Sequence, residues 1–166
     1  MRKPLAVLMI GIAGAASGCA PQSPPALQAD RIVVEKSRRQ MHLMRNDATV
    51  KTYRIALGGN PLGHKQQEGD SRTPEGGYVV DTRNPQSRFH LSLRVSYPSA
   101  ADRQRAARRG VSPGGDIFIH GTPNGAADEA AFIGRDWTDG CIAVTNAEIR
   151  EIWAAVGDGT PIEIRP

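Results

Sequence analysis

Cysteine and aromatic residues are scarce in this chain, which has two cysteines among 166 residues and 5% aromatic side chains. The four histidines, His42, His64, His90 and His120, lack the close spacing of metal ligands, and no pair of neighbouring cysteines supports them. No metal site and no cofactor is therefore expected. The basic residues come without a helix-turn-helix, zinc-finger or aromatic-basic strand signature, so nucleic acid is not an expected partner.

The N-terminal apolar run is too short to cross a bilayer. Leu5 to Ala16 is almost wholly apolar, follows the positive charges of Arg2 and Lys3, and leads into Ser17-Gly18-Cys19. This segment resembles a bacterial lipoprotein signal, although such signals usually have leucine where Ala16 stands. The resemblance implies cleavage before Cys19 and a diacylglycerol on its sulfur. An ordinary secretory signal is the alternative, and both predict export.

These features divide the sequence into a signal at 1–18, a proline-rich tether at 19–29 and one domain at 30–166. The sequence pI of 9.4 overstates the charge of the mature protein, because loss of Arg2 and Lys3 lowers the formal net charge from +4 to +2. Ala20 stands where an inner-membrane retention signal has aspartate. A lipid anchor at Cys19 is therefore expected to hold the domain in the periplasm, at the outer membrane.

Export of the protein affects the expected chemical state of Cys141. Structural cysteines are normally paired in an oxidising compartment, and one left over forms an intermolecular bond or is a reactive thiol. Once Cys19 carries a lipid, Cys141 has no partner in its own chain. A buried cysteine acting as a small apolar side chain is the alternative, and the cysteine count does not decide between them.

The neighbours of Cys141 favour the reactive thiol. Residues 117–119 form a short β-favouring run that ends at His120-Gly121, which places an imidazole at a strand end. Asp139-Gly140 predicts a tight turn into a second strand, from Cys141 to Thr145. If these strands pair, the sulfur lies beside the imidazole, which raises the thiolate fraction and helps to protonate the leaving group.

Four motifs occur in order along residues 30–166. They are Arg31-Ile32-Val33-Val34, Arg72-Thr73-Pro74-Glu75-Gly76, His120-Gly121 and Asp139-Gly140-Cys141. Together they resemble the L,D-transpeptidase catalytic domain, or YkuD-type domain, of bacterial peptidoglycan enzymes. The resemblance implies that Cys141 is the nucleophile, that His120 is its base and that the Gly121 carbonyl orients the imidazole. It also implies a mainly β fold with a few helices: a β-sandwich or mixed sheet with a C-terminal helix packed on it, and a thiol groove beneath a mobile flap.

The cysteine motif departs from that family. The usual motif is Ser-His-Gly-Cys followed by an apolar residue and Arg or Asn, whereas this chain has Thr-Asp-Gly-Cys-Ile-Ala at 138–143. Asp139 either accepts a hydrogen bond near His120 or makes the turn, and we favour the turn. A carboxylate beside the thiol is expected to raise the cysteine pKa, which leaves His120 and backbone amides to stabilise the thiolate. Thr138 and Asp139 are also candidate substrate contacts.

Strands are expected at residues 31–35, 40–45, 49–57 and 78–81, with a long glycine-rich loop from Gly58 to Gly76. From Arg88 to Tyr97 the sequence alternates, which predicts that Phe89, Leu91, Leu93 and Val95 face the core. The polar face of this strand, with His90 and Ser92, either meets solvent or lines the substrate groove.

Two helices are expected in the second half of the chain. Residues 100–109 carry four arginines, which form either a solvated face or a basic lid for carboxylates or anionic headgroups. After a capping signal at 145–148, Ile149, Ile152, Trp153 and Val156 recur at helical spacing, so this helix is expected to pack on the sheet. Residues 161–164 form a short final strand.

The predicted chemistry is covalent acyl transfer. Cys141 attacks the carbonyl between the third and fourth residues of a peptidoglycan stem peptide, His120 moves the protons, and amides near Gly140 and Cys141 stabilise the oxyanion. D-Alanine leaves, and an amine of another stem takes the thioester to form a crosslink between third-position residues. The stem and the bond attacked are implied by the family resemblance. The alternatives are a hydrolase of the same family, acting as an L,D-carboxypeptidase or releasing wall-attached protein, and a lipid-anchored peptidoglycan-binding protein without turnover.

Overall fold

The computed structural model describes residues 26–166. The predicted signal, Cys19 and most of the tether lie outside the described residues. Within them, the strands are β1 (Arg31–Glu35), β2 (Gln40–Arg45), β3 (Ala48–Arg54), β4 (Gly76–Ser87), β5 (His90–Val95), β6 (Phe118–His120), β7 (Ile142–Ala143) and β8 (Pro161–Arg165). The helices are α1 (Ala100–Arg108), α2 (Ala130–Ile133) and α3 (Asn146–Ala155).

The strands form one mixed sheet in the order β3-β2-β1-β8-β4-β5-β6-β7. The β1–β8 and β6–β7 pairs are parallel and the other neighbours are antiparallel. The two ends of the sheet also meet, because Ala56, just after β3, exchanges two backbone hydrogen bonds of 2.9 Å with Ala143 of β7. The prediction of a mainly β fold with a mixed sheet is confirmed, and the sheet curls until its end strands touch.

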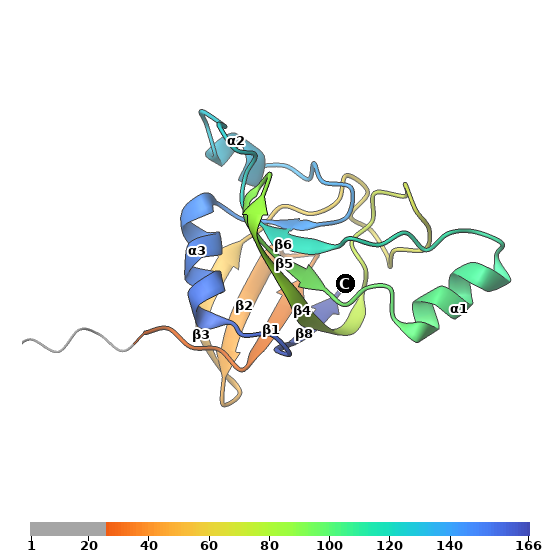
Figure 1. Ribbon diagram of the computed structural model, residues 1–166, viewed down its shortest axis with the longest axis horizontal. Helices are drawn as coiled ribbons and strands as arrows, with labels where there is room; N and C mark the ends of the chain where they lie inside the picture. Colours follow the sequence, from red (N-terminus) through yellow and green to blue (C-terminus); the bar gives the residue numbers. More distant parts are fainter. Residues whose placement is uncertain (1–25) are drawn as a thin grey trace, which may run out of the picture.

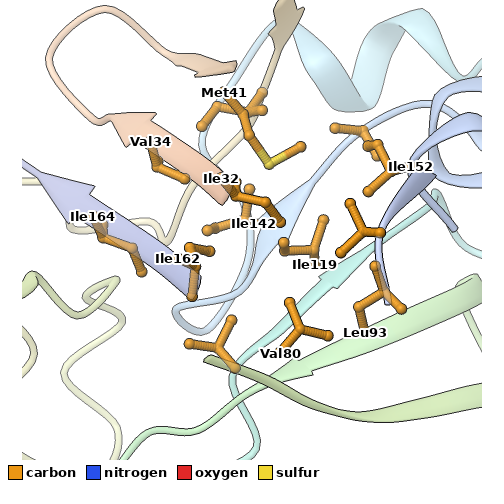
Figure 2. Packing of buried hydrophobic residues seen from close by; sticks show 14 of the residues in the cluster. Ile32, Val34, Met41, Val80, Leu93, Ile119, Ile142, Ile152, Ile162 and Ile164 are labelled. Carbon is orange, nitrogen blue, oxygen red and sulfur yellow. The ribbon is translucent and has the colours of Figure 1, made fainter. Parts of the chain in front are cut away.

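Apolar side chains on the inner face of this curved sheet form the core (Figure 2). In β1, a β-branched run, Ile32, Val33 and Val34 are all buried, whereas β2 buries alternate residues, Met41 and Leu43. The strand β4 is 12 residues long and pairs first with β8 and then with β5, with irregularities in the β5 register that bend it.

The helix α3 covers β5 and β6, as predicted for the C-terminal helix (Figure 1). Thr145 and Glu148 form a reciprocal capping box at its start, and Ile149 and Ile152 are fully buried against the sheet. Trp153 packs partly against the core and stacks under the guanidinium of Arg83, 4.1 Å from the ring centroid. Thr145 lies two residues after the end of β7, so the capping box of α3 begins almost directly after that strand.

Several predicted elements differ from the structure. The third strand ends at Arg54 instead of residue 57, because the chain then turns away to pair with β7. Phe89 was expected in the core but lies in the β4–β5 hairpin, just before β5, where the register shifts between Asn84 and Ser87. The short helix α2 was not predicted, since its four residues have no side-chain cap and none is buried.

The helix α1 extends away from the sheet, at the right of Figure 1. Its capping box joins Ser99 and Asp102, and only Asp102 and Ala106 of its residues are buried. The long loop between β3 and β4 is anchored by the buried Lys36, whose Nζ donates to the carbonyls of Gly63 and Thr73. Among residues 26–166, no helix is long and apolar enough to cross a membrane.

Candidate active site

Two neighbouring strands bring the thiol and the imidazole to one cleft. In the parallel β6–β7 pair, Ile119 lies opposite Ile142, and both isoleucines are fully buried in the core. Side chains alternate along a strand, so His120 and Cys141, which adjoin these isoleucines, point to the other face of the sheet. Both line a cleft of about 620 Å³. The strand pairing expected from the sequence is present.

The His120 ring has a defined tautomer. Its Nδ1 lies 2.6 Å from the carbonyl oxygen of Gly121, which can only accept a hydrogen bond, so Nδ1 carries the proton. The other ring nitrogen, Nε2, is then free to accept a proton. Burial lowers the pKa of His120, although the Gly121 bond opposes this effect, and the side chain is 3% exposed. At neutral pH the imidazole is therefore an uncharged base.

Gly121 occupies a place where no side chain fits. A Cβ there would overlap Asn146 Oδ1 and would lie 3.0 Å from the carbonyl oxygen of Phe89. Asn146, the first residue of α3, accepts a hydrogen bond from the Thr122 amide at 3.0 Å and donates to Glu129 at 2.9 Å. The helix thus holds the segment whose carbonyl orients His120.

Aromatic side chains surround the imidazole. Phe89 lies 4.5 Å from the His120 ring in a tilted stack, and Trp137 meets it edge-on at 5.8 Å. Phe132 of α2 packs on Trp137 in turn, at 5.3 Å. Phe89 and Trp137 line the cleft, but the sequence analysis assigned neither to the site. Trp137 could have been predicted as a site residue from its position four residues before Cys141. Phe89 could not, because the sequence around it has the alternating pattern of a strand.

The Cys141 thiol is protonated in the resting protein. Burial is the main cause that raises the pKa of Cys141 to about 11; the carboxylates of Asp139 and Asp116 add to the rise, and the Phe118 amide and Lys65 oppose it. The sulfur accepts a hydrogen bond from the Phe118 amide at 3.4 Å and donates to the Asp116 carbonyl at 3.5 Å. The side chain is half-buried, so it is accessible from the cleft. The resting site holds a neutral thiol and a neutral imidazole instead of an ion pair.

Thr138 shapes the turn that precedes Cys141. Its hydroxyl donates to the Cys141 carbonyl at 2.7 Å and accepts from the Gly140 amide at 3.2 Å. Gly140 has φ of 128°, and a Cβ there would lie 2.5 Å from the Arg72 carbonyl oxygen. Glycine is therefore required in this position. Because its amide is already engaged by Thr138, the Cys141 amide is the better placed of the two predicted oxyanion donors.

The remaining predicted site residues separate into two groups. Asp139 is exposed at the cleft, and within the described chain no hydrogen bond joins it to His120. Ser92 is buried, lies opposite His120 in the β5–β6 pair and lines the cleft. His90 does not line the cleft; its Nε2 lies 3.0 Å from Arg150 Nη1 of α3. The structure therefore brings Ser92, but not His90, to the candidate site.

The arginines at the C-terminal end of α1 lie apart from this cleft. Arg105, Arg108 and Arg109 line a separate cavity of about 280 Å³ together with His64, so α1 forms no lid over Cys141. In the part of the chain that the structure describes, no three His, Cys, Asp or Glu side chains gather in a way that could hold a metal ion.

The fold agrees with comparisons to known proteins. The sequence model of the YkuD family, described as the L,D-transpeptidase catalytic domain, matches residues 29–164. The chain belongs to this family. It is 32% identical over 107 residues to the Escherichia coli protein named "Putative L,D-transpeptidase YafK", covering 63% of this chain and 36% of that protein. It is 28% identical over 141 residues to a Bacillus licheniformis protein with the corresponding YkuD name, covering 82% and 66%.

A solved structure shows the same fold. The helical cell shape determining protein Pgp2 from Campylobacter jejuni superposes with a TM-score of 0.62 at 22% identity, over 81% of this chain and 46% of Pgp2. This YkuD-family chain thus spans less than two thirds of the length of each of these three proteins.

Proposed function

We propose that this YkuD-family protein is a peptidoglycan L,D-transpeptidase that uses Cys141 as its nucleophile. The observation that carries the proposal is the placement of His120 in β6 and of Cys141 immediately before the neighbouring parallel strand β7. The Cys141 thiol and the His120 imidazole face one cleft, and the Gly121 carbonyl leaves His120 Nε2 free to accept a proton.

The first step is acylation of the sulfur. As Cys141 Sγ attacks the amide carbon between the third and fourth stem residues, its proton passes to His120 Nε2, because neither group is charged at rest. The Cys141 amide donates to the developing oxyanion. When the carbon–nitrogen bond breaks, His120 returns the proton to the departing nitrogen, and D-alanine leaves the thioester.

The second step transfers the acyl group to an amine. The amine of another stem attacks the thioester carbon, its proton passes through His120, and the free thiol of Cys141 is regenerated. The carboxylates of Asp116 and Asp139 line the cleft together with the guanidinium of Arg88, so a stem peptide meets charges of both signs there.

A hydrolase is the second candidate function. The cleft rim around Asp139 is exposed, and the aspartate makes no bond to His120 in residues 26–166, so water can reach the thioester. In that case the products are a trimmed stem or a released wall-attached protein. A wall-binding protein without turnover remains the alternative outside enzymes.

Incubation with defined tetrapeptide stems and mass analysis of the products separates these functions. Transpeptidation gives a dimer that has lost one D-alanine, hydrolysis gives a tripeptide, and both require a thioester on Cys141. The Cys141→Ser variant is expected to lose at least about 1,000-fold in rate. Unchanged substrate with wild-type protein, or equal turnover by the serine variant, would refute the proposed nucleophile.

Anchoring through Cys19 is a separate proposal, since this residue lies outside the described part of the chain. We propose that the mature protein carries a diacylglycerol there and resides at the periplasmic face of the outer membrane. Intact-protein mass and metabolic lipid labelling of cells expressing wild type or Cys19→Ala test this. The alanine variant is expected to lose the label and the membrane association.

A further inference from the structure

The long loop between β3 and β4 packs against the turn that carries Cys141. At one end of the loop, the Gly59 amide donates to the Thr138 carbonyl at 2.9 Å. At the other end, the Arg72 carbonyl lies so close to Gly140 that a Cβ there would be 2.5 Å away. The loop therefore bounds the turn from two sides, and its shape determines what surrounds the sulfur.

A buried ion pair determines the shape of this loop. Lys65 is 3% exposed, and its Nζ lies 2.8 Å from Asp70 Oδ1. The same oxygen accepts the Arg72 amide at 3.1 Å, and Asp70 Oδ2 accepts the amides of Gln66 at 2.7 Å and Gln67 at 3.1 Å. Burial raises the Asp70 pKa, but these hydrogen bonds outweigh it and lower the pKa to about 2. Asp70 is thus ionised, and Lys65 supplies its buried countercharge.

The charge of Lys65 also reaches the thiol. The side-chain charges that shift the Cys141 pKa most are Asp139, Lys65 and Asp116, and of these only Lys65 lowers it. The Lys65 ammonium thus opposes the two carboxylates that act on the thiol. His120, which also faces the cleft, is neutral at rest and adds no charge until it takes the thiol proton.

We infer that Lys65 is a positioning residue for the thiolate of Cys141. Its ammonium shares Asp70 Oδ1 with the amide of Arg72, and the Arg72 carbonyl packs against Gly140, next to the reactive cysteine. When the Cys141 proton moves to His120, negative charge develops on sulfur between two carboxylates, and the buried ammonium stabilises it. Lys65 contacts no substrate in this role. The inference rests on the proposed function of Cys141 as nucleophile.

The test measures thiol reactivity as a function of pH. Wild type, Lys65→Met and Lys65→Arg are alkylated with iodoacetamide from pH 7 to 11, and peptide mass analysis counts only adducts on Cys141. We expect Lys65→Met to raise the thiol pKa and slow alkylation at pH 8 about tenfold, which corresponds to one pKa unit. Lys65→Arg keeps the charge and is expected to restore the rate to within about threefold of wild type.

Lys36 provides the matched control. It is also a buried lysine, 2% exposed, and it holds the same loop through Gly63, Thr73 and Glu75. If Lys65 acts through its charge, Lys36→Met loosens the loop but leaves the Cys141 pKa unchanged. Equal pKa shifts in Lys36→Met and Lys65→Met, or no shift in Lys65→Met, would overturn the inference.

The alkylation test of Lys65 can fail or succeed independently of the proposed transpeptidase function. Should Lys65→Met fail to fold, Lys65→Gln removes the charge but keeps a hydrogen-bond donor for Asp70, and it must still raise the thiol pKa. Alkylation requires no stem peptide, so it remains measurable if the protein turns over no substrate. An unchanged thiol pKa alongside normal crosslinking would refute only the role of Lys65.

Discussion

The two reactive groups proposed here are held in different ways. His120 is part of β6, is 3% exposed and has its ring oriented by the carbonyl of the next residue. Cys141 precedes its strand, is half-buried, and is held by Thr138 and by a loop that begins some 80 positions earlier in the chain. Geometry at the histidine thus depends on the core, whereas geometry at the thiol depends on polar contacts between loops.

This difference separates two properties of the site. The base is oriented by backbone groups whose positions follow from the sheet and from α3, so it is insensitive to surface charge. The thiol pKa is raised by burial and is then adjusted by Asp139, Asp116 and Lys65, which come from three separate segments. Substitutions near His120 are therefore expected to change stability and rate together, whereas removal of a charge near Cys141 is expected to change mainly thiol reactivity.

The largest effect is expected from removing the base. His120→Gln should lower the rate of thioester formation with a stem peptide about 100- to 10,000-fold, since no other group takes the thiol proton. Alkylation of Cys141 at pH 11 should be almost unchanged, because hydroxide then supplies the thiolate. Single-turnover mass analysis measures the first rate. Undiminished thioester formation would show that another residue is the base.

The next effect tests the close packing behind His120. Gly121→Ala forces a methyl group against Asn146 and should destabilise the protein by about 1–3 kcal/mol. Displacement of the orienting carbonyl should also slow acylation by up to about 100-fold. Urea denaturation and single-turnover rates measure the two effects. Gly157→Ala, which meets nothing within 4 Å, should leave both unchanged.

Thr138 tests the polar contacts on the thiol side. Thr138→Val leaves the buried Gly140 amide and Cys141 carbonyl without their partner, at a cost of about 1–3 kcal/mol in unfolding free energy. Thr138→Ser keeps the hydroxyl and should recover most of that stability. Urea denaturation of both variants checks this. Equal losses in valine and serine variants would mean that the methyl group, and not the two hydrogen bonds, stabilises the turn.

The smallest effect comes from the exposed carboxylate. With a Cys141 pKa of about 11, about one thiol in a thousand is ionised at pH 8, and each lowering of the pKa increases that fraction. Asp139→Asn removes a charge that raises this pKa, so alkylation at pH 8 should become about two- to fivefold faster. Salt should shrink the gain, because exposed charges are screened. Asp158→Asn, on an exposed loop, is the matched control; a slower Asp139→Asn protein would contradict the assigned sign.

Local sequence patterns predicted much of the fold. The apolar run of β1, the alternation of β2 and the capped amphipathic pattern of α3 each carry their own signal, and all three elements occur where expected. Phe89 was misplaced because the alternation in the sequence begins before the first residue of β5. An alternating pattern does not reveal a shift in strand register. The end of β3 was missed because Ile55, Ala56 and Leu57 are buried like strand residues but pair with a distant partner.

Residues of the candidate site could be predicted only where they belong to a short sequence motif. Cys141 and His120 were predicted because each belongs to a recognisable local motif, and their proposed roles stay predictions. Trp137 and Asp116 line the same cleft and Lys65 acts on the thiol, but none has a local pattern that distinguishes it from a structural or solvated residue. Ser92 and His90 lie two residues apart on one strand, yet only Ser92 lines the cleft.

The amino-acid order alone thus indicated most of the strands and helices, the family and the two side chains proposed to react, because periodicity, caps and motifs act over a few residues. The tertiary structure decided the tautomer of His120, the protonation of Cys141 and the charges around the sulfur. Those properties depend on burial and on distances between segments far apart in the chain, which no local pattern encodes.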